Sequence, residues 1–540
     1  MKYYLISIGG TGAKCLEAFV HMNAAGLMKN RGEIKIIYVD PDASNGNLAK
    51  TKNTVAAYIN AYRGASQENN FFKNPLSPEE ITWNPVPDGS NANLLTIFDR
   101  PNMDVKAENL DCLFDVLFSE EEQNTSLTEG FRAHPSIGAA VIGANMNMDE
   151  DGSVWKSMVN DIGEQEARIF FFGSVFGGTG AAGFPNIAKI IRKYFNDKAA
   201  NNNPDSKNIK KDCRIRMAGC LMLPYFTFPK ASEADMVDPN DPTKRIIVPD
   251  SGKFLASTYA ALNYYDTSDL VGDVFDAVYL LGDKQFVNID KYKPGRADQR
   301  NKAHFLEMLA ALAALEFFNK DSKDKYFEEA KCYMLAMLGN DFTWKDLPPV
   351  YSGCDIEAKL KTFIRMAYMY RSMVYPKLEE CYQDEEKYKD NDWISGFLHE
   401  IRPVRSKLKS LFKKEEDQAY ITDENHKIIV AFEEYCVKFL DWLKDFTYSE
   451  EPAMLRCGKL INEGTYAYDD SKTYEENLTA AEGSKVIKPE EIFVEKANTT
   501  FDGGENNFLQ QMVNSDAEAK GVKPMLAMVY DLCKDGKEVK

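Results

Sequence analysis

A glycine-rich turn between an apolar run and a helical pattern is the feature that most limits the fold of this chain. Residues 169–185 read IFFFGSVFGGTGAAGFP. The run Ile169–Phe172 has the composition of a buried strand, and Ile187 and Ile191 continue a helical spacing beyond the glycines. Such a turn can bring main-chain N–H groups onto an anion, because glycine permits close approach and a helix N-terminus attracts negative charge. The alternative is a tight turn without a ligand.

A second unit of the same kind opens the chain. The apolar run 3–8 is followed by Gly-Gly-Thr-Gly-Ala-Lys at 9–14 and then by another helical pattern. A further buried-type strand at 34–39 ends at Asp40-Pro41-Asp42. An acidic residue at this place commonly faces a ribose or a metal-bound phosphate, although Asp40 would also serve as a cap for the next turn. The alternation of strands and helices predicts an α/β fold with a doubly wound, mainly parallel sheet.

The opening glycines do not match a P-loop. That motif needs a glycine before its lysine and a hydroxyl residue after it. Here Ala13 precedes Lys14, and Cys15 follows. We therefore expect that backbone amides of several loops would hold any phosphate.

A third loop of this type covers residues 130–138, which read GFRAHPSIG and lead into a small-residue helix at 139–145. The Arg132 guanidinium could bind a phosphate in a bidentate manner. The alternative is a solvated Arg132 and a packed His134. Phosphate hydrolysis would also require neutralisation of developing charge. A metal or a positive group would supply that neutralisation, and a further group would have to orient water; the candidates for these roles are Asp40, Asp42, Lys14 and Arg132.

The spacing of apolar residues, together with glycine and proline residues that break helices and strands, predicts the remaining elements. These are helices at 110–118, 254–265, 305–318, 355–390, 393–415, 424–446 and 517–532, and strands at 214–223 and 275–281. Residues 60–110 are interpreted as a long segment that leaves the sheet. No helix or strand is predicted for residues 333–346. The helix at 305–318 is apolar on nearly every face, so we expect it to be buried between domains. Pro348-Pro349 then precedes a strongly charged helical pattern. We divide the chain into an α/β domain at 1–300, a central helix and linker at 301–349, and a mainly α-helical region at 350–540.

Composition narrows the functional classes. The net charge of −18 over 540 residues disfavours nonspecific binding to nucleic acid or to an anionic membrane. No apolar run is long enough for a transmembrane segment, and the first residues are typical of a strand, not of a signal peptide. The ten cysteines are scattered without a C-x-x-C pair, so we expect free thiols, no metal site and a cytoplasmic location.

The three loops together resemble the tubulin/FtsZ superfamily, and more closely its divergent bacterial tubulin-like branch. The signature loop of that family reads G-G-G-T-G-[ST]-G. This chain keeps Gly177-Gly178-Thr179-Gly180, whereas Phe176, Ala181 and Ala182 replace the first glycine, the hydroxyl residue and the last glycine. Residues 134–138 are similar to the family's asparagine-proline loop, with His134 in place of asparagine. The helix from Asn301 to Phe318 resembles the family's central helix.

This resemblance implies a guanine nucleotide, GTP or GDP, held mainly by backbone amides, with magnesium as an additional candidate. The residues that would bind it are Gly9, Gly10, Thr11, Gly12, Ala13, Asp40, Asp42, His134, Gly177, Gly178, Thr179, Gly180 and Asn301. The missing hydroxyl at Ala181 would weaken the phosphate site by one hydrogen bond, on the order of 1 kcal/mol. The family's catalytic acids follow the central helix, and Asp341 and Asp346 loosely match them. Their alternative roles are a helix cap and a solvated turn.

The leading hypothesis is a tubulin-like GTP-binding protein that assembles into filaments or oligomers in a nucleotide-dependent way and is a candidate GTPase. One alternative is a non-hydrolysing scaffold that binds a partner protein through its helical C-terminal region. Another is a nicotinamide- or flavin-dependent oxidoreductase that uses only the opening strand, turn and helix with Asp40. No nucleic-acid partner is expected.

Overall fold

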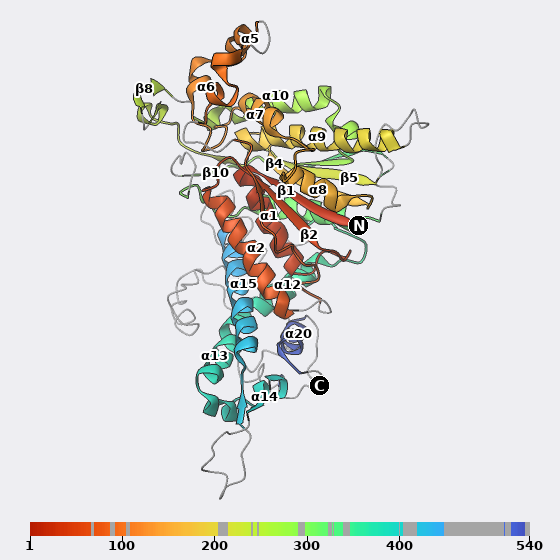
Figure 1. Ribbon diagram of the computed structural model, residues 1–540. Coiled ribbons are helices and arrows are strands. Elements are labelled where there is room, and N and C mark those ends of the chain that lie inside the picture. The colour runs from red at the N-terminus through yellow and green to blue at the C-terminus, as the bar shows by residue number, and fades with distance from the viewer. Residues whose placement is uncertain are drawn as a thin grey trace, which may run out of the picture.

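A seven-stranded sheet, parallel throughout, forms the centre of the molecule (Figure 1). The strand order is β11 (Lys331–Met337), β9 (Ala277–Asp283), β5 (Ile215–Met222), β4 (Ala167–Ser174), β1 (Lys2–Ile8), β2 (Ile34–Val39) and β3 (Ile81–Trp83). This computed structural model describes residues 1–65, 70–86, 92–103, 109–202, 214–238, 241–245, 248–289, 297–321, 327, 329–337, 346–398, 400–402, 418–447, 512 and 520–534.

The two central strands are apolar on both faces because helices cover both sides of the sheet. All eight residues of β4 are buried. The Phe170 ring lies against Phe317 on one face, whereas Phe171 lies against Phe184 and Phe275 on the other. A strand buried on both faces needs a continuous apolar run and not an alternating one. This accounts for the sequence IFFF at the centre of the sheet.

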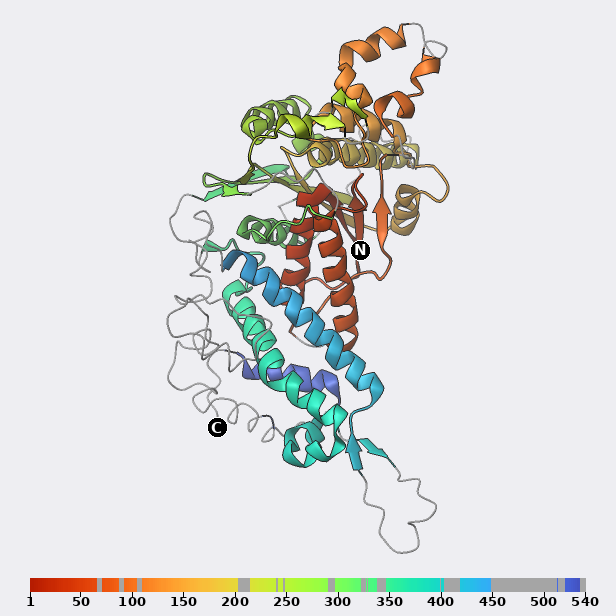
Figure 2. The same ribbon diagram turned by 90° about the vertical axis from the view of Figure 1, so that its left-hand side faces the viewer.

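Helices α1 (Gly9–Ala24), α2 (Gly46–Ala65) and α11 (Phe305–Asn319) lie on one face. Helices α7 (Pro135–Asn145), α9 (Gly178–Asn202) and α10 (Phe254–Thr267) lie on the other (Figures 1 and 2). The chain moves across the sheet in opposite directions from β1 to β2 and from β4 to β5. Strands β1 and β4 therefore flank a topological switch point, where doubly wound sheets bind their ligands. The connection from β9 to β11 through α11 moves across the sheet in the same direction as the connection from β4 to β5 through α9, but it lies on the opposite face. The two crossover connections therefore have opposite handedness.

The other helices and strands before residue 300 are short. They are α3 (Leu94–Ile97), α5 (Leu110–Leu117), α6 (Glu120–Asn124), α8 (Val154–Ile162), β6 (Phe226–Thr227), β7 (Val237–Asp238), β8 (Asp241–Arg245) and β10 (Val287–Asn288). The elements beyond residue 350 are α12 (Ile356–Met369), α13 (Tyr375–Gln383), α14 (Asp392–Leu398), β12 (Glu400–Arg402), β13 (Gln418–Tyr420), α15 (Asp423–Thr447) and α20 (Val522–Leu532). Helix α15 runs along α2 (Figure 2).

The C-terminal helices share one hydrophobic core with the α/β part. The Phe72 ring centroid lies 4.8 Å from that of Tyr435 in α15, and the Phe71 centroid lies 4.9 Å from that of Tyr530 in α20. Aromatic side chains bury large areas, so these contacts join the two regions firmly.

The structure confirms the doubly wound α/β sheet and the burial of the helix near 305–318, of which every residue except Glu316 is buried. Three expectations are wrong. Residues 60–110 include the edge strand β3, which is too short to show a period. Lys331–Met337 forms β11, although no element was predicted for residues 333–346. The helix expected over 393–415 ends at Leu398, where β12 and β13 form an antiparallel pair.

None of the helices in the described part of the chain combines the length and the apolar character that a membrane crossing needs. The cysteines within the described ranges are free thiols, as their scattered positions predict.

His21 lies at the contact between α1 and α15 and is fully buried. Its Nδ1 atom is 3.0 Å from the Tyr435 hydroxyl oxygen, and its ring packs against Phe439 and Trp442. Burial among apolar rings lowers the pKa of His21 well below its ordinary value, so the folded chain holds it neutral.

We expect His21→Phe to gain stability relative to the wild type as the pH falls. The unfolded chain binds a proton at residue 21 below about pH 6.5, whereas the folded chain does not, so this histidine lowers the free energy of unfolding by about 1.4 kcal/mol per pH unit below that point. Above it, the wild type keeps its hydrogen bond to Tyr435 and should be more stable by about 1 kcal/mol. Urea titrations from pH 5 to 8 measure the difference, and parallel curves would contradict the assignment.

Candidate functional site

A cavity opens at the carboxyl ends of the strands, over the switch point between β1 and β4. Its empty space, open mouth included, is about 1110 Å³. It is lined by the turns after β1, β2 and β4, by the segments that follow β5 and β10, and by the segments at the starts of α7, α10 and α11. Loops far apart in the sequence thus meet at the position where this class of sheet binds ligands.

The turn after β1 brings the N-terminus of α1 to the cavity. Gly9 has a φ of +69°, in the left-handed region, and a Cβ atom there would lie 3.3 Å from the Thr179 Cβ atom. Gly12 has another role, since a Cβ atom at that position would lie 2.6 Å from the Phe172 carbonyl oxygen of β4. No side chain caps α1, and its first turn carries no acidic residue. Its main-chain N–H groups are therefore suited to an anion.

The turn after β4 brings the N-terminus of α9 to the same cavity. A Cβ atom at Gly178 would lie 2.8 Å from the Ala133 nitrogen, and one at Gly180 would lie 2.7 Å from the Ser174 nitrogen. Only glycine permits these approaches of backbone to backbone. The first turn of α9 also lacks an acidic residue.

The segment before α7 has an unusual backbone. Gly130, Arg132 and Ala133 have φ angles of +93°, +45° and +61°. Positive φ costs energy for residues with a Cβ atom, and such residues often cluster where a loop contacts a ligand. The Arg132 guanidinium pairs with Glu129 at 3.0 Å, and both residues line the cavity.

The turn after β2 contributes a buried carboxyl group. Asp40 is 4% exposed, and its Oδ1 atom accepts a hydrogen bond of 3.0 Å from the Asp42 main-chain N–H. Its Oδ2 atom is buried and has no hydrogen-bond partner among the described residues. Burial raises the pKa of Asp40 to about 7. A buried carboxyl oxygen without a partner at a cavity wall is a typical mark of a ligand site.

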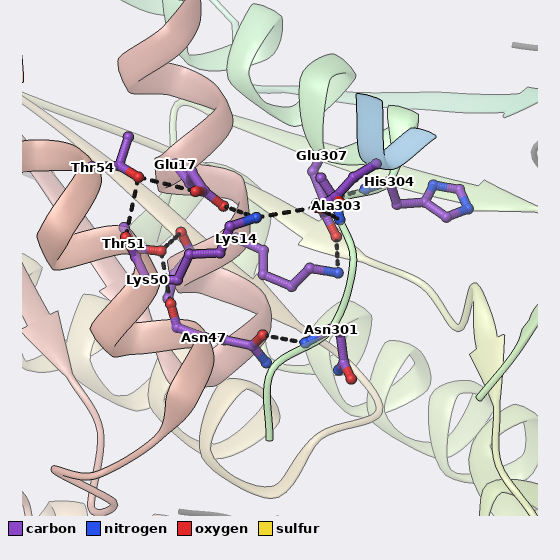
Figure 3. Close-up of polar contacts among 12 residues, drawn as sticks. Lys14, Glu17, Asn47, Lys50, Thr51, Thr54, Asn301, Ala303, His304 and Glu307 are labelled. Carbon is purple, nitrogen blue, oxygen red and sulfur yellow. Dashed lines mark hydrogen bonds and ion pairs between the residues drawn. The ribbon is translucent and has the colours of Figure 1, made fainter. Parts of the chain in front are cut away.

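Amide side chains join this turn to the segment before α11. Asn45 caps α2 by accepting from the Asn47 and Leu48 main-chain N–H groups, and its amide donates to Gln299 at 2.6 Å. The Asn47 Oδ1 atom accepts from the Asn301 main-chain N–H at 2.8 Å (Figure 3). The amide side chains of Asn45, Asn47 and Gln299 are thereby held at one wall of the cavity.

A buried polar cluster lies beneath the first turn. The Lys14 Nζ atom is 2.5 Å from the Glu307 Oε1 atom (Figure 3), and the same oxygen accepts from the Tyr225 hydroxyl at 2.8 Å. Glu307 also accepts from the His304 main-chain N–H, which completes a capping box at the start of α11. Burial, with a smaller effect of Lys14, lowers the pKa of His304 well below its usual range. Both cations that line the cavity in the described residues, Lys14 and Arg132, are thus held in ion pairs.

Part of the cavity lining is aromatic. This part includes Phe176, Tyr225, Phe226, Phe228 and Phe254. These rings pack on one another, and the centroids of Phe176 and Phe254 are 5.0 Å apart. A cavity lined by main-chain N–H groups, polar side chains and aromatic rings suits a ligand that has a charged part and a flat apolar part.

The structure brings most of the predicted binding residues to this cavity. Those that line it are Gly9, Gly10, Thr11, Asp40, Asp42, Gly177, Gly178, Thr179, Gly180 and Asn301. Gly12, Ala13 and His134 are not in the lining: Gly12 and Ala13 are packed in the first turn of α1, and the His134 Nδ1 atom lies 2.9 Å from the Arg132 carbonyl oxygen. Asp346 is exposed and does not line the cavity, and Asp341 lies outside the described residues.

Two parts of the lining were not predicted from the sequence: the group of amide side chains, here called the amide wall, and the aromatic residues. The amide wall comes from Asn45, Asn47 and Gln299. A signal for it was present in the Asn-x-Asn pattern after Asp42. The aromatic run Tyr225–Phe228 directly after a strand could likewise have indicated a binding surface.

Within the described residues there is no group of three or more histidine, cysteine or acidic side chains that could hold a metal ion. Comparison of the sequence with protein-family models and with curated proteins found no match.

We expect Asp40→Asn to gain stability relative to the wild type as the pH rises from about 4 to 7. In the unfolded chain Asp40 ionises near pH 4, whereas burial delays its ionisation in the folded chain to about pH 7, so the folded wild type loses about 1.4 kcal/mol per pH unit over this window. Asparagine still accepts the Asp42 N–H but carries no charge. Urea midpoints of both proteins between pH 4.5 and 8 test this, and a constant difference would show that the carboxyl group is not buried as described.

Proposed function

We propose that this chain is a tubulin-like guanine-nucleotide-binding protein that holds GTP or GDP in the switch-point cavity. The observation that carries the proposal is the convergence of two glycine turns, Gly9–Thr11 and Gly177–Gly180, from different strands onto one cavity. An oxidoreductase that uses only the opening turn would leave the second turn without a role.

The combination of polar and aromatic lining residues supports a nucleotide over a simple anion. Main-chain N–H groups at the starts of α1 and α9 suit phosphate oxygens. Lys14 and Arg132 are engaged by Glu307 and Glu129, so amides would provide most of the recognition. The aromatic side chains of the lining would offer a purine base a stacking surface. Asp40 and Asp42 could assist a magnesium ion, which usually needs one or two carboxylates together with substrate phosphates.

The tubulin-like assignment also draws support from α11. This helix starts beside the cavity and runs through the core next to α1, as a central helix would. The part beyond residue 350 is mainly helical in its described residues. We propose nucleotide-dependent self-assembly, with hydrolysis confined to the assembled form. Asp346 is exposed and is not part of the cavity lining, so it would act on the nucleotide of a neighbouring subunit.

Gly178→Ala should weaken nucleotide binding by about ten-fold or more, equivalent to ~1.4 kcal/mol. Its Cβ atom would meet the main chain of Phe131 and Ala133, which would force the turn and the adjacent loop apart. Gly143→Ala in α7 is the matched control, because a Cβ atom there meets nothing within 4 Å. Titration of a fluorescent GDP or GTP analogue measures the affinities. Absence of binding to the wild type, or equal affinities of both variants, would contradict the proposal.

A ligand present at a hundred times its dissociation constant should stabilise the wild type by about 2.7 kcal/mol. Thermal unfolding with GDP, GTP or ATP checks this, and negative-stain microscopy of the same samples checks assembly. Filaments or oligomers with GTP only would agree with the proposal. A thermal transition that no nucleotide shifts would favour the non-hydrolysing scaffold.

A further inference from the structure

We infer that Asp445, near the C-terminal end of α15, is a positioning residue of the cavity. It acts on the segment 299–304, here called the pre-α11 loop, which carries the lining residues Gln299 and Asn301. The inference rests on the proposed function only in the identity of the ligand. It assigns to the helical C-terminal region a direct role in shaping the binding site.

The contact is a hydrogen bond between the two regions. The Ala303 main-chain N–H donates to the Asp445 Oδ2 atom at 2.9 Å. The Lys50 Nζ atom of α2 lies 3.2 Å from the same oxygen and 3.4 Å from the Glu17 Oε2 atom of α1. Figure 3 shows Ala303, Lys50 and Glu17 along this line of polar contacts. Asp445 thus joins α1, α2 and the pre-α11 loop.

Neighbouring charges give the contact its strength. Glu17 is 2% exposed and also accepts from the Thr54 hydroxyl at 3.0 Å. Burial raises the pKa of Glu17, with Lys50 acting in the opposite direction, and the two carboxylates near Lys50 raise the pKa of that ammonium group despite its burial. A partly buried, charge-assisted hydrogen bond is stronger than one on the surface.

The position of Asp445 within its helix is a second observation. A carboxylate in the last turn of a helix interacts unfavourably with the helix dipole, which favours cations there. Asp445 lies in the last turn of α15, which ends at Thr447. Its contact with the pre-α11 loop offers a compensating interaction.

Helix α2 holds Gln299 and Asn301 of the pre-α11 loop, and Asp445 holds Ala303 of the same loop. Asn47 accepts from the Asn301 N–H and donates its own main-chain N–H to the Gln299 carbonyl oxygen at 3.0 Å. Asp445 supplies the tie on the far side, at Ala303. A ligand that contacts Gln299 or Asn301 would therefore restrain the end of α15, and the end of α15 would affect ligand affinity to the same degree.

Hydrogen exchange without ligand tests the positioning itself. The full chain is compared in four forms: wild type, Asp445→Ala, Asp445→Asn and Glu434→Ala. Asparagine keeps an oxygen acceptor for the Ala303 N–H, whereas Glu434→Ala removes an exposed carboxylate elsewhere on α15. We expect the fastest exchange over residues 299–306 in Asp445→Ala, an intermediate rate in Asp445→Asn, which keeps the acceptor but loses the charge, and a rate close to the wild type in Glu434→Ala. Equal exchange in all four forms would overturn the inference.

Titration with a fluorescent GDP analogue tests the effect on binding. We expect Asp445→Ala to weaken affinity at least about five-fold, with Asp445→Asn and Glu434→Ala closer to the wild type. Equal affinities of Asp445→Ala and Glu434→Ala would overturn the inference while leaving nucleotide binding intact. If the wild type binds no nucleotide, the proposed function fails, and the exchange experiment still decides the role of Asp445.

Discussion

The close approach of two helix N-termini across the central strands is the constraint on which the rest of this structure depends. Helices α1 and α9 start directly after β1 and β4 and meet where Gly9 faces Thr179. Gly12 and Gly180 permit this approach, because each lies against the main chain at the carboxyl end of β4. Glycine is unfavourable within a helix by up to about 1 kcal/mol relative to alanine. We attribute the glycines at these positions to the close approach of the two turns, which forms the cavity.

The cavity is electrostatically unusual. Its lysine and arginine are neutralised by Glu307 and Glu129, whereas Asp40 is buried with an oxygen that lacks a partner. Burial of Asp40 lowers the stability of the folded chain as the pH rises from about 4 to 7. Because its lysine and arginine are already paired, the cavity favours recognition of a ligand by main-chain N–H dipoles, which require no reorganisation when the ligand binds. The shared core with α15 extends the influence of the site into the helical C-terminal region.

The sequence was sufficient for the elements with strong local signals. The two strand, turn and helix units and the all-apolar helix α11 carry continuous patterns of the expected period, and most of the predicted glycine-turn residues line the cavity. The edge strands β3 and β11 were missed because pairing with a neighbour, and not a local pattern, defines them. The amide wall depends on Gln299, which only the tertiary fold brings to Asn45. The roles of Asp341 and Asp346 stay predictions.

The central claim is that main-chain amides of both glycine turns bind the phosphates of one nucleotide. A crystal structure of the protein with bound GDP tests it most directly. The account predicts phosphate oxygens within about 3.2 Å of main-chain nitrogens in both turns, at residues 10–12 and at residues 178–180. A nucleotide bound elsewhere, or phosphates that contact one turn only, would contradict it.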